Sequence, residues 1–275
     1  MFSGNLKARE REVSGGMEFP VVVSQYFWRI RLNELLDHDS YQIEKYVEGV
    51  GNPKELADKV IRDVEYPFHH GQPDDLHVWN AFHGKRCYKV EEDFWQKASE
   101  TAFAKMGDCE DSSILYVAAA RRLGVKPEDV FVVFGYVQTE GGEFLGGHGW
   151  VYVRDPSFGK EGFVYVETTL DEPPAEYPKV PDIAKPFNWR GIVLVPEILW
   201  NDEIYRSVAS AANFGLIIYQ LRRYWGVKKR IFGYADLGRK LKETKKKYEA
   251  LQLAWKLPVK PLKKAGVLSR LRWRR

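Results

Sequence analysis

One apolar helix, predicted for residues 111–123, constrains the fold of this chain more than any other segment. The stretch contains no Gly or Pro, and apolar side chains recur in it at helical spacing. Gly124 follows at a position where glycine commonly ends a helix. The residues in front read MGDCED, so Cys109 is predicted to lie at or beside the N-cap of this helix.

The position of Cys109 favours a reactive thiol. Unpaired backbone N–H groups and the positive end of the helix dipole meet at a helix N-terminus, and both stabilise a thiolate relative to a thiol. A free cysteine is more often a small buried residue without chemistry. The helix start alone therefore leaves both interpretations open, and the segments that follow decide between them.

Two alternating segments downstream of Cys109 predict a β-hairpin. His148 begins the first, in GGHGWVYVRD, and a turn-rich break at residues 155–162 separates it from the second, FVYVETTLD. Pairing aromatic side chains across the hairpin sets His148 opposite Glu167, with Cβ atoms about 5 Å apart. The aromatic pairs in this register are Tyr152 with Phe163 and Trp150 with Tyr165.

Two alternatives stay open for the acidic partner of His148. A slip of one residue would place Thr168 opposite His148 instead, because side chains on a strand alternate between its faces. Asp171, which follows Glu167 in the same segment, is a second acidic candidate. Glu167 is preferred because of its predicted position on the strand.

These motifs resemble those of the transglutaminase-like superfamily of papain-like thiol enzymes, particularly the bacterial and archaeal transglutaminase-like cysteine proteinases. The matching segments are GDCED, GHGWVYV and YVETT, which occur in the order Cys, His, acid. The family pattern has Asp-Pro-Thr where this chain has Glu167, Thr168 and Thr169. Upstream, NPKELADKVIRDVEYPF resembles the helix that precedes the nucleophile helix, so the resemblance spans about residues 53–172.

The resemblance implies an α+β, papain-like fold with the nucleophile helix packed on an antiparallel sheet. It implies that Cys109 is the nucleophile, that His148 is the base and that Glu167 orients the imidazole, with Asp171 as the alternative acid. The backbone N–H of Cys109 is one expected oxyanion donor. An upstream aromatic or amide side chain supplies the second in the family. Trp95 is the candidate here, although a tryptophan at helical spacing is more often part of the core.

The predicted reaction is thiolate attack on a peptide or amide carbonyl, through a thioester that water then hydrolyses. A transglutaminase with an amine acceptor is the alternative, because it shares the first half-reaction. An inactive relative that binds peptides or a polyanion is disfavoured by the intact Cys109, His148 and Glu167. Glu110 and Asp111 are interpreted as capping residues at the helix start. The expected partner is a protein or peptide substrate, and no cofactor is expected.

The chain is expected to contain one main domain and an appendage, since 275 residues with 44% hydrophobic side chains can bury a substantial core. Residues 1–20 are predicted to be a mobile leader, residues 21–200 a catalytic domain and residues 201–275 a helical, strongly basic C-terminal region. The predicted helices are residues 26–50, 53–64, 91–105 and 204–224. Residues 65–88, rich in turn-forming residues, are predicted to be a long loop or a small insertion near the active site. The predicted strands are residues 130–138, 148–153, 163–169 and 191–195.

Charge is distributed unevenly along the chain. Residues 228–275 contain 17 Lys or Arg against three acidic residues, a net charge of +14, and the rest of the chain carries −10. Clustered cations gain affinity for polyanions by counterion release, so this tail is a candidate for binding nucleic acid or an anionic surface. Docking onto the acidic body of the protein, or a solvated helix, is the preferred alternative.

Cysteine usage and the N-terminus predict a cytoplasmic protein. Two cysteines, Cys87 and Cys109, do not make a disulfide framework, and a catalytic thiol requires a reducing environment. The N-terminal residues lack the apolar stretch of a signal peptide, and no segment has 18 consecutive apolar residues. The histidines of residues 65–88 match no familiar ligand spacing, so no metal site is predicted.

Overall fold

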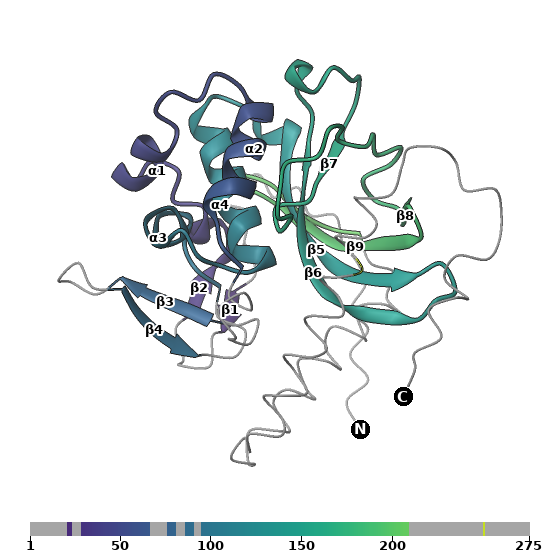
Figure 1. The fold of residues 1–275 in the computed structure, drawn as a ribbon, viewed down its shortest axis with the longest axis horizontal. Coiled ribbons are helices and arrows are strands. Elements are labelled where there is room, and N and C mark those ends of the chain that lie inside the picture. Colours follow the sequence, from purple (N-terminus) through teal and green to yellow (C-terminus); the bar gives the residue numbers. More distant parts are fainter. Residues whose placement is uncertain are drawn as a thin grey trace, which may run out of the picture.

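The computed structural model describes residues 21–23, 29–66, 76–80, 86–90, 95–208 and 250 of the chain. Helices gather on one side of a curled antiparallel sheet (Figure 1), so the fold is α+β, as the sequence predicts. This architecture is compatible with a papain-like or transglutaminase-like core.

Helix α4 (Cys109–Arg122) is the centre of the helical layer. Every side chain from Cys109 to Ala120 is buried, because α1 (Tyr41–Tyr46), α2 (Pro53–Asp63) and α3 (Ala98–Ala104) surround α4 and the sheet covers its remaining side. The predicted helix end is confirmed, since Gly124 follows the C-cap with a φ of +89°. An apolar helix of this kind folds only when neighbours cover it on all sides.

The main sheet contains the strands β5 to β10, all antiparallel. Four of them are β5 (Val130–Thr139), β6 (Phe144–Val153), β7 (Val164–Val166) and β9 (Ile192–Trp200), and they lie in the order β9-β5-β6-β7. Both β8 (Phe187–Trp189) and β10 (Tyr205–Ser207) pair with β9. One face of the sheet packs on α4 through valines, and the opposite face buries a cluster of aromatic side chains.

Short elements complete the described part of the chain. Strands β1 (Val21–Val23) and β2 (Arg29–Arg31) form one two-stranded sheet, and β3 (Leu76–Asn80) and β4 (Arg86–Val90) form another. Three single turns of 3₁₀-helix are η1 (Leu32–Leu35), η3 (Pro127–Asp129) and η4 (Pro156–Phe158).

One prediction for the N-terminal half is wrong. In place of the single helix predicted for residues 26–50, the described residues form β2, η1 and α1 in succession. The segment predicted to be a long loop or small insertion, residues 65–88, contains β3 and the first residues of β4. Leu32, Leu35 and Leu36 are nevertheless buried. These leucines and Trp28 are the residues whose spacing predicts one apolar helix face, and Trp28 lies outside the described residues. Apolar spacing therefore identified the three leucines as buried, but it did not reveal how often the backbone turns between them.

Helix and strand boundaries differ from the predicted ones in several places. Helix α3 is shorter than predicted, β6 begins at Phe144 so that His148 lies within the strand, and β7 covers only Val164–Val166. Residues 205–207, which were predicted to be helical, form β10 and extend the sheet beyond residue 200. Pairing with β9 outweighs the helical preference of this segment.

Other predictions lie outside the described residues. They concern the leader at residues 1–20 and almost all of the basic tail, in which only residue 250 is described. The three-part division of the chain and the polyanion partner therefore stay predictions. None of the helices among the described residues combines the length and apolar character needed to span a bilayer.

Candidate active site

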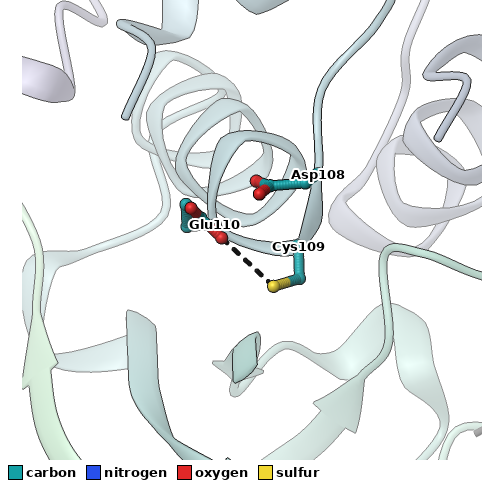
Figure 2. Close-up of side chains that lie close together, drawn as sticks. All are labelled: Asp108, Cys109 and Glu110. Atoms are coloured by element: carbon teal, nitrogen blue, oxygen red, sulfur yellow. Dashed lines mark hydrogen bonds between the residues drawn. The ribbon is translucent and has the colours of Figure 1, made fainter. Parts of the chain in front are cut away.

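Cys109 is the first residue of α4, with Asp108 as the N-cap residue, so its predicted position at the helix start is confirmed. The side chain is only 3% exposed and packs against Tyr66. Its thiol donates a hydrogen bond to the carboxylate of Glu110, with Sγ and Oε2 3.1 Å apart (Figure 2). Cys109 is not part of a disulfide. Its hydrogen bond to Glu110 holds the thiol at the N-terminus of α4.

Asp111, a buried residue in the first turn of α4, holds the helix start in place through hydrogen bonds to its carboxylate. Its carboxylate accepts hydrogen bonds from the backbone N–H of Asp108 at 3.3 Å and from the backbone N–H and side-chain amide of Gln96, both at 2.7 Å. Burial raises the pKa of Asp111 to about 7, although these hydrogen bonds lower it. The bond to the N-cap N–H confirms the predicted capping contact of Asp111.

Gln96 is a residue that the sequence analysis missed. Its side-chain amide also donates to the carbonyl oxygen of Met106 at 3.2 Å, so it ties the loop before Cys109 to the first turn of α4. Gln96 is fully buried. A signal was present, since the resemblance points to an aromatic or amide side chain upstream of the cysteine and Gln96 directly follows Trp95.

Glu110 differs from its predicted role. The sequence predicts a helix-capping carboxylate, whereas in the structure this carboxylate accepts the hydrogen bond of the Cys109 thiol. One group of side chains in the described part of the chain is close enough together to hold a metal ion. It consists of Asp108, Cys109 and Glu110, whose carboxylate oxygen and Sγ atoms all lie within 4.8 Å of one another. All three are buried, so two carboxylates lie close to the thiol in a region of low polarity.

His148 and Glu167 form a buried pair. The distance between His148 Nε2 and Glu167 Oε2 is 2.8 Å, and the two side chains are 1% and 0% exposed. The contact predicted between these two residues is therefore present. The carboxylate accepts from the Nε2–H group, which leaves Nδ1 as the nitrogen that can take up a proton.

The register that led to this contact is wrong by two residues. Tyr152 pairs with Tyr165, not with Phe163, and Val151 pairs with Val166. A shift of two residues leaves every side chain on the same face of the sheet. Glu167 therefore remains on the face of His148 and reaches it diagonally from just beyond the end of β7.

Several donors surround the Glu167 carboxylate besides His148. The Tyr165 hydroxyl donates to Oε2, while the Thr169 hydroxyl and backbone N–H donate to Oε1 at 2.6 and 3.2 Å. Burial by itself raises the pKa of Glu167, but the charge of His148 and these hydrogen bonds together hold it below its usual range. The carboxylate therefore stays ionised at neutral pH.

Asp171, the alternative acid, lies elsewhere. It is exposed and lines a pocket of about 270 Å³ next to the start of α4. The pocket is bounded by the end of α2, Gly107, Ser112 and residues 168–171. The recorded hydrogen bond of the His148 ring goes to Glu167 and not to Asp171.

Gly149 brings the strand β6 against the start of α4. A Cβ atom on Gly149 would lie 2.9 Å from Glu110 Cα and 3.2 Å from the carbonyl carbon of Cys109. The backbone of β6 beside His148 therefore rests directly on the first residues of α4. Within the described part of the chain, His148 Nδ1 is a buried atom with no hydrogen-bond partner, so the structure does not join it to the thiol by a hydrogen bond.

Trp95 packs as a core side chain. Its ring stacks on Trp200 with centroids 5.7 Å apart and meets Phe134 at 5.3 Å. Trp95 is partly buried against the core that surrounds α4. These contacts agree with the core interpretation, and an oxyanion role for its indole N–H stays a prediction.

Comparison with known proteins gives similarities to solved structures. No protein-family model and no curated protein sequence matches the chain. Solved structures of Legionella pneumophila LapG align with it at 14% identity. The EGTA-treated form covers 62% of this chain and 73% of its own at a TM-score of 0.34. The structure of LapG covers 66% of this chain and 82% of its own, at a TM-score of 0.34. The calcium-bound form covers 66% of this chain and 85% of its own, at a TM-score of 0.33.

Proposed function

We propose that this protein is a transglutaminase-like thiol enzyme that hydrolyses peptide or amide bonds, with Cys109, His148 and Glu167 as its triad. The observation that carries the proposal is the buried pair of His148 and Glu167. His148 lies on β6, and the neighbouring Gly149 packs against the backbone of Cys109 and Glu110. A nucleophile at a helix start, a base on a strand and an acid that orients the base are the groups that thiol acyl transfer requires.

The proton begins on the thiol and ends on the leaving amine. The Cys109 side chain turns from Glu110 toward His148, and Nδ1 accepts its proton. The thiolate attacks the carbonyl carbon, and the imidazolium, stabilised by Glu167, returns the proton to the amine nitrogen as the C–N bond breaks. Water activated by His148 then hydrolyses the thioester and releases the acid.

The start of α4 supplies the electrostatic part of the mechanism. In this proposal the backbone N–H of Cys109 donates to the oxyanion, because the first N–H groups of a helix have no partner within the helix. The pocket between α2 and residues 168–171 offers a place for a substrate side chain beside the scissile bond. A hydrolytic enzyme needs no second site for an amine acceptor, which favours hydrolysis over transamidation.

The test is the rate of iodoacetamide labelling of Cys109 against pH, measured by intact mass and peptide mapping. An activated thiol reacts with an apparent pKa well below the usual value of about 8.5. His148→Ala is expected to lower the rate at pH 7 about tenfold, because the imidazolium no longer stabilises the thiolate. Cys87 serves as the internal reference, and His38→Ala is the matched histidine control.

Ordinary slow labelling of Cys109 in the folded protein would refute the proposal. The protein would then be better described as a binding module built on this fold. Fast labelling that is lost in His148→Ala would instead justify assays with peptides, simple amides and amine acceptors, and release of acid without incorporation of amine would identify hydrolysis.

A further inference from the structure

The Glu167 carboxylate has a full set of hydrogen-bond donors. His148 Nε2 and the Tyr165 hydroxyl share Oε2, and the Thr169 hydroxyl and backbone N–H share Oε1. Glu167 and Tyr165 are 0% exposed and Thr169 is 6% exposed, so water does not supply these bonds. Two protein donors therefore reach each carboxylate oxygen.

This arrangement favours the ionised form of Glu167. An ionised carboxylate is purely an acceptor, whereas a protonated carboxyl group must donate one hydrogen bond. All four contacts around Glu167 come from groups that can donate, and the backbone N–H of Thr169 can only donate. Protonation would therefore require a hydroxyl group or the His148 ring to change from donor to acceptor.

The ionisation of Glu167 in turn decides the tautomer of His148. An ionised Glu167 accepts from Nε2–H, and the neutral ring then carries its lone pair on Nδ1. A protonated Glu167 can donate to Nε2 instead, which moves the ring proton to Nδ1. In that tautomer Nδ1 cannot accept the proton of the Cys109 thiol.

We propose that Tyr165 and Thr169 are positioning residues, whose hydroxyl groups hold Glu167 ionised and aligned so that His148 keeps Nδ1 free to accept a proton. This inference rests on the proposed function, in which His148 is the base. It assigns a role to two hydroxyl groups that the resemblance does not identify.

Packing alone does not explain these hydroxyl groups. The Tyr165 ring lies in the aromatic cluster beneath the sheet, where its centroid is 6.0 Å from that of Phe187. A phenylalanine would fill the same volume, and burying a hydroxyl costs free energy unless it forms a hydrogen bond. Glu167 is the recorded acceptor of the Tyr165 hydroxyl.

Other titratable groups lie on the elements around Glu167. They are His148 and Tyr152 on β6, Tyr165 on β7, and Asp108, Cys109, Glu110 and Asp111 at the start of α4. Within the described part of the chain, His148 and Tyr165 are the members of this set with a hydrogen bond to Glu167. Helix α4 reaches the neighbouring Thr168 through the uncharged hydroxyls of Ser112 and Ser113.

The test reads the tautomer of His148 directly. The full chain with Cys109→Ala, which removes the thiol proton, is labelled with ¹⁵N-histidine, and long-range ¹H–¹⁵N spectra are recorded at pH 8. The His148 signals are assigned with His148→Ala. At this pH we expect a single tautomer protonated at Nε2 in every variant. In a second set of spectra at pH 5, where the pair takes up one more proton, we expect a doubly protonated His148 ring beside an ionised Glu167 in the unchanged protein. In Tyr165→Phe and in Thr169→Val we expect an admixture of the neutral tautomer protonated at Nδ1, because the extra proton then lies partly on Glu167.

The same variants with Cys109 intact are tested by iodoacetamide labelling at pH 7. The loss of one hydrogen bond to a buried charge is expected to lower the labelling rate about tenfold. Two matched controls keep both readouts near those of the unchanged protein. Thr169→Ser retains the hydroxyl. Tyr152→Phe removes a buried phenol hydroxyl that belongs to the residue opposite Tyr165 and, within the described part of the chain, forms no hydrogen bond to Glu167.

These measurements distinguish a positioning role of Tyr165 and Thr169 from a merely structural one. A slower labelling rate with the tautomer unchanged, or a lower melting temperature alone, would show a merely structural role and overturn the inference. Ordinary slow labelling of the unchanged protein together with the expected tautomers would refute the proposed enzyme but leave the role of Tyr165 and Thr169 intact.

Discussion

At the scale of single residues, Glu110 places a carboxylate against the Cys109 thiol, which has to ionise in the proposed mechanism. The side chain is 4% exposed, and its Oε2 atom lies 3.1 Å from Cys109 Sγ. A negative charge this close favours the protonated thiol, which opposes the effect of the helix dipole. The reactivity of Cys109 therefore depends on two opposing local fields.

Neutralising Glu110 is expected to make Cys109 more reactive. Glu110→Gln removes the like charge, so the apparent pKa of the thiol falls by about one unit and labelling at pH 7 becomes faster. The measurement is the iodoacetamide rate profile from pH 5 to 9. Glu161→Gln, which changes an exposed carboxylate in the turn before β7, should leave the profile unchanged. Slower labelling of Cys109 in Glu110→Gln would contradict this expectation and show that the Glu110 carboxylate increases the reactivity of the thiol.

At the scale of secondary-structure elements, the contact between β6 and the start of α4 positions the site. Glycines flank His148 on both sides, but only Gly149 faces the helix closely. An added Cβ atom would lie 2.9 Å from backbone of α4 at Gly149, whereas at Gly147 its nearest neighbour is 3.9 Å away. The two positions therefore give a matched pair of substitutions on the same strand.

Gly149→Ala is expected to separate β6 from α4. The clash involves backbone atoms that cannot rotate away, so the free energy of unfolding should fall by about 1–3 kcal/mol and Cys109 should label more slowly. Gly147→Ala should change the stability by less than about 0.5 kcal/mol. Urea denaturation measures the first effect and iodoacetamide labelling the second. Equal stabilities of the two variants would contradict the close contact.

At the scale of the whole molecule, the unequal charge distribution raises the question of what the basic C-terminal region binds. Residues 228–275 carry a net charge of +14, whereas the rest of the chain carries a net charge of −10. Such a tail can bind an external polyanion, dock onto the acidic body of the same molecule or form a solvated helix. The first alternative differs from the other two in how retention of the intact protein on a polyanion responds to salt.

Retention on heparin distinguishes these alternatives. If the tail binds polyanions, the full chain should elute at a salt concentration that truncation before Lys228 lowers sharply, because each lost phosphate-like contact reduces the salt dependence. Unchanged Cys109 labelling in the truncated protein would verify that its fold is intact. Flow-through of both proteins at low salt would exclude a polyanion partner.

Local sequence signals were sufficient for the parts of the fold in which neighbours along the chain dominate. Helix α4, its start at Cys109, its end before Gly124, and strands β5 and β6 follow from spacing, capping and glycine positions. The helix predicted for residues 26–50 failed, because the buried leucines of that segment lie on a 3₁₀ turn. Periodicity indicates which side chains are buried, and tertiary packing decides the path of the backbone between them.

By itself the sequence determined which chemical groups are present and indicated the elements that carry them: a cysteine at a helix start, a histidine on a strand and an acid in the strand segment that follows. Only the tertiary structure decided the register between Tyr152 and Tyr165, the links from Gln96 to Asp111 and the contact of Glu110 with the thiol. Alternation along a strand fixes the face of a side chain, because it has a period of two residues. The partner of that side chain depends on how distant elements pack, which no local pattern encodes.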